Sequence, residues 1–306
     1  MDARAFVIPV AHIEGRAAIG HSGPPAVGLV FCDRSLVPRR PHRGSPSHIL
    51  AGWRVHTLCA RMDVKLYSIS VSHPARAAGL MLRYKGIDFE LVDLLPGTQR
   101  ALLRLHGFRE GTVPAMTIDG RKVQGSLEIS RALEELKPDP PLFPADPEQR
   151  AAVEEAERWG EAVLQPVPRN VFRWGVARDR SLREALGEVT GVPAPAVGAV
   201  LMQPVAWYYA RIVSGATDET VRSDLASLPG WLDHVDELIA AGVIGGEQPN
   251  AADFQIALSV RLLLAFPPLS PLVESRPAAE LAMRIAPKFG GPLPIKLPAE
   301  WIPAAV

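Results

Sequence analysis

The stretch that begins at Asp63 alternates between strand-like and helical patterns of apolar residues. Residues 64–70 alternate apolar and polar side chains, which predicts a strand. Residues 75–85 carry apolar side chains at helical spacing, and Pro74 and Gly86 suit the start and the end of that helix. Beyond them the patterns predict a strand at 89–93, a helix at 98–106, a strand at 113–118, a hairpin turn at Asp119–Gly120, a return strand at 121–123 and a helix at 126–136.

The order of these elements predicts an α/β fold. A strand–helix–strand unit implies a right-handed crossover with parallel pairing, and the hairpin adds antiparallel strands. We therefore expect a thioredoxin-like domain with a mixed four-stranded sheet over residues 63–137.

Helical patterns dominate after a proline-rich linker at residues 138–147. We expect an all-helical domain over residues 148–286, followed by an irregular tail over 287–306 that is rich in proline and glycine. Pro204 and Pro229 are expected to kink or split their helices. The predicted helices are 148–164, 181–188, 196–213, 217–241 and 251–265.

The first 62 residues have a different composition. Residues 1–61 contain eight arginines, no lysine and three acidic residues, a net charge of +5, which leaves −5 for the remainder. Runs of proline and glycine break any periodic pattern, so we expect residues 1–62 to be disordered. An organellar transit peptide is one interpretation, but no sustained amphipathic helix supports it. We favour another: translation begins near Met62, and the leader is not part of the native protein.

Composition excludes several classes of function. The formal net charge is zero, and 47% of the residues are hydrophobic, so we expect a soluble, cytoplasmic protein with no nucleic-acid or membrane partner. The chain has two cysteines, Cys32 and Cys59, and both precede Asp63. A catalytic thiol, a redox pair and a cysteine-ligated metal site are therefore excluded from the main body. No metal-binding, Walker or dinucleotide-binding motif occurs, and we expect no metal.

Five groups of residues, in this order and spacing, resemble the glutathione S-transferase family. The resemblance extends over about residues 63–265 and implies the family's thioredoxin-like half and helical half. The matching strings are Leu66–Arg76 followed by Leu80–Ile87, Thr112–Ala115, Asp119–Ile129, Pro141–Pro144, and Gly245–Asp253.

The resemblance places Ser72 where a Ser, Tyr or Cys of the family interacts with the sulfur of the thiol cofactor. A thiol has a reference pKa near 8.5, and a hydroxyl donor at the positive end of a helix stabilises its thiolate. We predict Ser72 as the catalytic hydrogen-bond donor, with Ser70 as the fallback. The alternative is that Ser72 only caps the helix. His73 and Arg76 flank the site. His73 could polarise the thiol or contact substrate, but we interpret it as an exposed loop residue. Arg76 either helps to hold a carboxylate or is solvated.

Two further corners of a cofactor site follow from the resemblance. It implies a cis peptide between Val113 and Pro114 and a Val113 backbone that pairs with a peptide-like ligand. The alternative is a trans proline at a strand start. It also implies that Gly125 and Ser126, at a helix N-terminus, receive the γ-glutamyl carboxylate of glutathione. Many relatives have Glu or Gln where this chain has Gly125, with Gln124 one residue earlier.

The helical half offers structural residues rather than catalytic ones. Asn250 and Asp253 have the spacing of a capping box. The resemblance implies that aromatic side chains line a cleft for an apolar electrophile, but most aromatic residues at helical spacing belong to the core. The candidates are Trp159, Phe172, Trp174, Trp207, Tyr208 and Tyr209.

We therefore predict a glutathione S-transferase-like detoxifying enzyme that activates a low-molecular-weight thiol for attack on a small apolar electrophile. Glutathione is the expected thiol. The alternative is a non-catalytic binding protein with the same fold, which Gly125 and the lack of an active-site Cys or Tyr favour. A glutaredoxin-type oxidoreductase needs a cysteine where Ser72 or Ala75 stands. The zeta-type motif S-S-C-x-W-R is missing, so isomerisation is not singled out. By analogy with the family we expect a homodimer.

Overall fold

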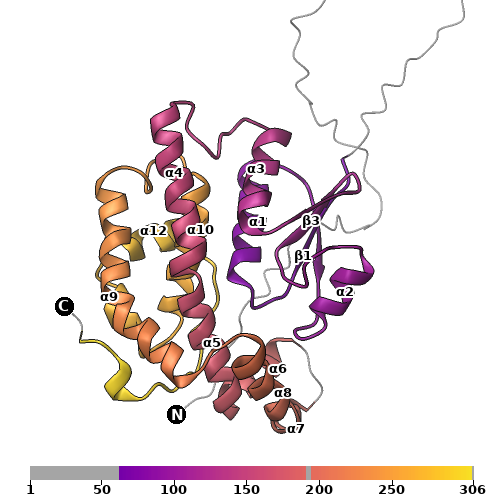
Figure 1. Cartoon of the computed structure of the whole chain (residues 1–306), viewed down its shortest axis with the longest axis vertical. Helices are drawn as coiled ribbons and strands as arrows, with labels where there is room; N and C mark the ends of the chain where they lie inside the picture. The colour runs from indigo at the N-terminus through magenta and orange to yellow at the C-terminus, as the bar shows by residue number, and fades with distance from the viewer. Residues whose placement is uncertain (1–61, 191–193, 305–306) are drawn as a thin grey trace, which may run out of the picture. The chain divides into compact units, whose positions relative to one another are not determined.

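The computed structural model describes residues 62–190 and 194–304. The predictions for the leader and its two cysteines lie outside the described residues. Residues 62–137, which hold the sheet, are called the sheet half below, and residues 147–304 the helical half (Figure 1).

The sheet half contains the predicted mixed sheet of four strands. β1 pairs with β2 in parallel and with β3 in antiparallel fashion, and β4 is antiparallel to β3, so the order is β2-β1-β3-β4. The hairpin between β3 and β4 turns at Asp119 and Gly120, whose φ angles of 47° and 85° suit the twist of a tight two-residue hairpin. The strands are β1 Val64–Ser68, β2 Glu90–Asp93, β3 Ala115–Ile118 and β4 Arg121–Gln124.

Three helices accompany this sheet: α1 (His73–Tyr84), α2 (Gln99–Leu105) and α3 (Ser126–Leu136). α1 begins two residues earlier than predicted, because Ser72 caps it and Pro74 occupies its first turn. α1 ends as predicted before Gly86, whose φ of 58° suits a glycine that terminates a helix.

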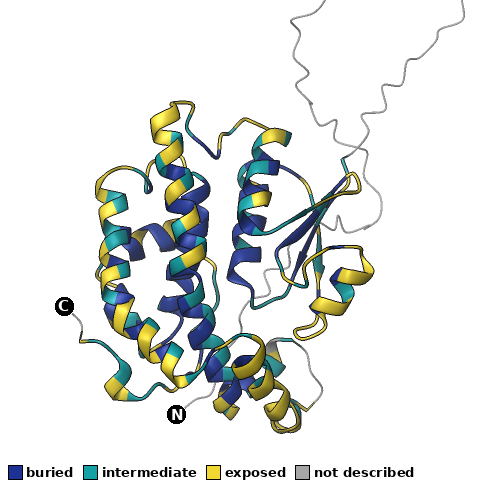
Figure 2. Ribbon diagram, viewed as in Figure 1, coloured by how far each residue is buried: buried dark blue, intermediate teal, exposed yellow. Residues whose placement is uncertain are grey.

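Helices make up nearly all of the helical half. Its core is α10, in which every residue from Ala251 to Leu263 is buried (Figure 2). The elements are α4 Pro147–Trp159, η1 Gly160–Leu164, α5 Pro166–Arg178, α6 Arg180–Val189, α7 Pro195–Leu201, α8 Gln203–Tyr208, η2 Tyr209–Val213, α9 Asp218–Ala240, α10 Ala251–Leu264, α11 Ser270–Val273, α12 Pro277–Ile285 and η3 Ala299–Trp301.

Of the two predicted helices that contain an internal proline, one is split and the other is continuous. The helix expected at 196–213 is split near Pro204 into α7, α8 and η2, as proposed, whereas α9 continues through Pro229 without a break. The helix expected at 148–164 changes to π-helical hydrogen bonding at Gly160. α10 passes close there, since a Cβ on Gly160 would lie 2.9 Å from the Ile256 side chain.

A buried lysine joins α1 to α3 and to the segment that follows it. The side chain of Lys85 is fully buried, and its Nζ donates to the Glu134 carboxylate at 2.7 Å and to the carbonyl oxygens of Lys137 and Pro140 at 2.6 and 2.8 Å. The same Glu134 oxygen accepts the Leu142 amide at 2.9 Å. All three protons of this ammonium group are therefore used inside the protein.

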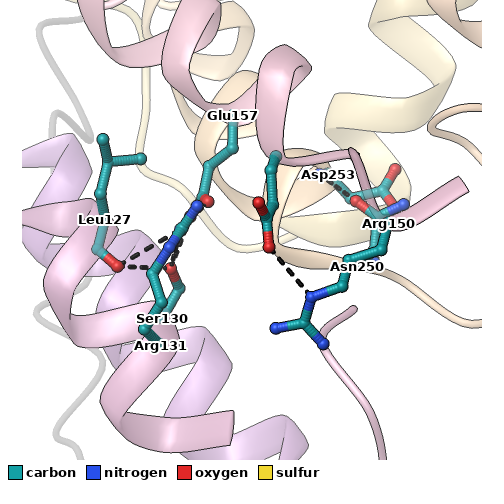
Figure 3. Close-up of polar contacts among 8 residues, drawn as sticks. Leu127, Ser130, Arg131, Arg150, Glu157, Asn250 and Asp253 are labelled. Carbon is teal, nitrogen blue, oxygen red and sulfur yellow. Dashed lines mark hydrogen bonds and ion pairs between the residues drawn. The ribbon is translucent and has the colours of Figure 1, made fainter. Parts of the chain in front are cut away.

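A second polar cluster joins the two halves (Figure 3). Glu157 of α4 is 1% exposed and accepts a 2.7 Å hydrogen bond from the Ser130 hydroxyl of α3. Its other carboxylate oxygen pairs with Arg131. Burial is the main cause that raises the pKa of Glu157, while the bonds from Ser130 and Arg131 oppose the rise.

The predicted capping box at the start of α10 is confirmed (Figure 3). The Asn250 side chain accepts the Asp253 amide at 3.1 Å, and the Asp253 carboxylate accepts the Asn250 amide at 2.8 Å. The other Asp253 oxygen accepts the Gly245 amide at 2.7 Å. This buried carboxylate thus fixes both the helix start and the loop that leads to it.

Exposed apolar side chains gather on α7, α8 and η2. Of the twelve large apolar side chains that are exposed within the described residues, nine lie between Val197 and Val213. A cluster of this kind on a protein surface usually marks an interaction site.

Candidate functional site

Ser72 lies at the N-terminus of α1, where the chain leaves β1. Its hydroxyl oxygen accepts the Ala75 amide at 3.3 Å, so Ser72 caps the helix as the structural alternative proposed. No acceptor for the hydroxyl proton is recorded among the described residues. The residue is 8% exposed. Capping and donation to a ligand are compatible, because the cap uses a lone pair of the oxygen and leaves its hydrogen available.

The end of β3 lies beside the end of β1. Their antiparallel register sets Tyr67 opposite Ala115, so the residues before Ala115 adjoin those after Tyr67. Ile69 and Val113 both pack against the apolar cluster that includes Tyr67. The Val113–Pro114 peptide is cis, as the resemblance implied.

The start of α3 completes this edge. The Gly125 amide donates to the Pro114 carbonyl at 3.1 Å. This bond directly joins the predicted Val113–Pro114 and Gly125–Ser126 parts of the site. Gly125 has a φ of 100° and caps α3 with no side-chain hydrogen bond, while Ser126, the first helical residue, is 3% exposed. The structure therefore places Ser72, Val113, Pro114, Gly125 and Ser126 along one edge of the sheet half.

Gln124 has a structural role. Its amide nitrogen donates to the carbonyl oxygens of Glu110 and Thr112 at 2.8 and 2.9 Å, and its oxygen accepts the Glu110 amide at 2.9 Å. These bonds hold the loop that precedes Val113. Gln124 consequently does not supply the polar side chain that many relatives have at the position of Gly125.

A hollow between the two halves opens beside Ser70 and Val71. Most of its other lining is apolar and comes from α5, α10 and the tail: Phe172, Leu262, Ala265, Phe289, Gly290, Gly291 and Leu293, together with Arg76. Of the six aromatic residues proposed from the sequence, Phe172 alone is among these lining residues. Trp174 is instead buried, where it donates to Asp218 at 2.6 Å.

The tail holds Arg76 in place at this hollow. The Arg76 guanidinium donates to the Phe289 carbonyl and stacks over the Phe289 ring, 4.8 Å from its centroid. Arg261 stacks on the same ring at 5.4 Å and donates to the Ala286 carbonyl at 2.9 Å. Burial, and next the charge of Arg261, lower the pKa of Arg76. Arg76 is therefore a structural contact rather than a solvated side chain.

His73 was interpreted from the sequence as an exposed loop residue, and this was wrong. It is the first residue of α1 and is 4% exposed, and its Nε2 has no hydrogen-bond partner. Burial, and next the nearby positive charges of Arg169 and Arg173, lower the pKa of His73 to about 3. Its imidazole is therefore neutral at physiological pH.

The sequence also gave no reason to single out Arg169 and Arg173 of α5 or Phe289 of the tail. Spacing within one helix places the two arginines one turn apart, but only the tertiary fold brings their charges near His73. Among residues 62–190 and 194–304 there is no group of three or more His, Cys, Asp and Glu that would hold a metal. Within the same ranges no helix has the length and apolar character needed to cross a membrane.

Comparison with known proteins shows similarity over the sheet half. Residues 66–141 match the family model of the glutathione S-transferase N-terminal domain. Maleylacetoacetate isomerase of Mus musculus is 37% identical over 94 residues, and glutathione S-transferase 1 of Dianthus caryophyllus is 34% identical over 108 residues. Residues 66–141 are therefore a domain of the glutathione S-transferase N-terminal type. The two alignments cover 29% and 34% of this chain, and 43% and 48% of the relatives, less than half of their lengths.

Solved structures extend the likeness of this glutathione S-transferase fold to the helical half. A glutathione S-transferase from Rhodospirillum rubrum F11 has a TM-score of 0.51 at 22% identity and covers 78% of this chain and 97% of its own. One from Sinorhizobium meliloti 1021 has a TM-score of 0.51 at 22% identity, with coverage of 74% and 90%. At this identity the structures show a shared fold.

Proposed function

We propose that the protein is a glutathione S-transferase-like enzyme that activates a low-molecular-weight thiol for attack on a small apolar electrophile. Glutathione is the expected thiol. The observation that carries the proposal is the Ser72 hydroxyl, which lies at the N-terminus of α1 and has no recorded acceptor for its proton. A donor at the positive end of a helix stabilises a thiolate. The enzymatic relatives named above support a catalytic role.

The other predicted binding residues, Val113 and Ser126, offer backbone groups to the thiol ligand. No hydrogen bond to the backbone amide or carbonyl of Val113 is recorded within the described part of the chain, so these groups are available to a peptide-like ligand. Among the described residues, no side chain caps the backbone amides at the start of α3, where Ser126 is the first helical residue. A helix N-terminus of this kind suits a carboxylate, here the γ-glutamyl group of glutathione.

Replacement of Ser72 tests the proposal. We expect Ser72→Ala to lower kcat/KM for glutathione and 1-chloro-2,4-dinitrobenzene about 10-fold, since one pKa unit on the thiol changes the thiolate fraction about 10-fold. The pH profile of kcat/KM should shift upward by about one unit. Initial rates measured from pH 5.5 to 8.5 give both quantities.

The helix cap requires its own control. Ser72→Gly also removes the hydroxyl but costs α1 only a few tenths of a kcal/mol, because glycine is a tolerated cap. Equal losses of activity in Ser72→Ala and Ser72→Gly, with Ser70→Ala unaffected, support the donor role. Unchanged rates in both Ser72 variants contradict it.

The non-catalytic alternative rests on Gly125, which leaves no side chain for the γ-glutamyl group. In that case glutathione, or another thiol, is retained on an affinity column and seen by calorimetry, but no electrophile is turned over. Absence of both binding and turnover contradicts the proposed function in either form.

A homodimer in the cytoplasm with a detoxifying role completes the proposal. The nine exposed apolar side chains between Val197 and Val213 are 45–67% exposed. Together they present on the order of 900 Å², against roughly 800 Å² per partner in a standard interface. The one charged residue between Val197 and Val213 is Arg211, and charge depletion is typical of interface cores. The expected partner is therefore a second copy of this chain.

Light scattering after gel filtration checks this prediction. The wild type is expected to have twice the mass of the 33.1 kDa chain. Leu201→Glu introduces a charge at the most exposed of these side chains and should yield the single-chain mass, while Leu105→Glu on the exposed surface of α2 should not. A monomeric wild type contradicts the dimer.

A further inference from the structure

Two arginines of α5 lie one turn apart without a carboxylate partner. Arg169 and Arg173 are half-buried, and no ion pair of either is recorded within residues 62–190 and 194–304. The Nε of Arg169 is buried and has no hydrogen-bond partner in the part of the chain that the structure describes. Arg173 stacks over the ring of Tyr209, 5.4 Å from its centroid. Arg178, near the end of the same helix, instead pairs with Asp218 at 2.5 Å.

The carboxylates nearest to this pair are engaged elsewhere or lie too far for a hydrogen bond. Asp224 exerts a favourable charge effect on Arg169, but its carboxylate accepts the Asn170 side chain at 2.8 Å. Glu161 acts on Arg169 through its charge, and no hydrogen bond joins the two. Burial is the main cause that lowers the pKa of both guanidinium groups.

The N-terminus of α1 faces these arginines with His73, not with an anion. His73 is 4% exposed and its Nε2 lacks a partner, so a buried polar atom stands next to two unneutralised cations. The start of α1 adds the positive end of a helix dipole. Charged groups withdrawn from water without partners are costly, and an anion offsets that cost.

We propose that Arg169, Arg173 and His73 form a binding site for a carboxylate of the bound ligand. Guanidinium groups present paired donors that match a carboxylate, and Nε2 of a neutral imidazole donates or accepts according to its tautomer. Phe172 lies between the two arginines in sequence and lines the apolar hollow. The matching ligand is an organic acid with an apolar body, which sets it apart from a purely apolar electrophile.

Either the electrophile or the thiol cofactor could supply this carboxylate. The inference rests on the proposed function, which provides these two ligands. Calorimetry separates them and needs no turnover. The probes are 3,5-dinitrobenzoate, its uncharged analogue 3,5-dinitrobenzamide, and glutathione. Each is titrated into the full-length wild type, Arg169→Met, Arg173→Met and the control Arg180→Met, whose side chain is exposed and paired with Glu184.

If the electrophile supplies the carboxylate, the wild type binds dinitrobenzoate about 10- to 100-fold tighter than dinitrobenzamide, the range of a charged hydrogen-bonded pair. This preference falls to near unity in Arg169→Met and Arg173→Met and persists in Arg180→Met. If the cofactor supplies it, the two variants weaken glutathione by the same factor, and the wild type does not distinguish benzoate from benzamide.

The NMR signal and the pKa of His73 test for direct contact with the ligand, because a purely structural role of His73 would leave both unchanged on ligand binding. In the NMR spectrum of the ring, binding of the carboxylate probe should shift the Nε2 resonance and raise the pKa of His73, whereas dinitrobenzamide should leave both unchanged. Arg169→Lys keeps the charge without the paired donors, and it should retain part of the carboxylate preference. The proposal is overturned if no probe distinguishes wild type from the two methionine variants, even where glutathione turnover is normal.

Discussion

Lys85→Met is expected to lower the free energy of unfolding by about 3–5 kcal/mol, the range for removal of one partner from a buried ion pair. Methionine fits the space of the lysine stem but donates no hydrogen bond. The change leaves the Glu134 carboxylate without its cation and leaves the Lys137 and Pro140 carbonyls unsatisfied. Urea denaturation followed by circular dichroism measures the loss.

Lys65→Met is the matched control for this experiment. Lys65 also pairs with a glutamate, Glu90, at 3.0 Å, but their side chains are 34% and 61% exposed. An exposed pair contributes about 0–1 kcal/mol. If Lys65→Met and Lys85→Met destabilise equally, the buried lysine does not have the role assigned to it.

Acidification is expected to destabilise the wild type through His73. The pKa of this residue is about 3 in the folded protein, against 6.5 for an unperturbed histidine. The unfolded chain therefore takes up a proton, as the pH falls from about 6.5 to 3, that the folded protein does not. Stability falls across this window by up to about 1.4 kcal/mol per pH unit, and by about 2 kcal/mol between pH 7 and pH 5.

His73→Gln removes this titration and should flatten the profile over that interval by about 2 kcal/mol, relative to the wild type. The measurement is a series of urea unfolding curves from pH 7.5 to 4.5. His234→Gln, at a surface site of α9 where the side chain is 41% exposed, should keep the wild-type profile. Parallel profiles for wild type and His73→Gln would show that the imidazole is not held neutral.

The sheet half was predictable from the sequence because its signals are local. The strand pattern from Val64, the Asp119–Gly120 turn and the stop at Gly86 each act over a few residues. The turn and the stop are confirmed, and the strand forms but ends at Ser68, two residues earlier than predicted. α5 and α12 were not predicted. Pro166, Pro168 and Pro277 lie in these segments, and proline inside a pattern normally argues against a helix. In the structure these prolines fall in the first turns of the helices, where no backbone donor is lost.

The site was predictable only in part, for a related reason. Ser72, Val113 and Ser126 could be proposed as site residues because their strings resemble those of the family, and strand pairing explains why they lie along one edge. Arg169 and Arg173 carry no sequence signal, because an arginine on a helix normally reaches water or a neighbouring acid. Their lack of a partner is a property of tertiary packing, as is the burial of His73.

The contact between Arg76 and Phe289 has a consequence for the order of folding. It joins residues 213 positions apart, and the hollow beside Ser70 is lined from both regions of the chain. Contacts of such sequence separation are slow to form, because loop closure must precede them. During synthesis the sheet half emerges first, so the hollow cannot close until Phe289 and Leu293 have left the ribosome. A chain stalled before Phe289 therefore has the α1 N-terminus with Ser72, but it lacks the tail residues that line the hollow.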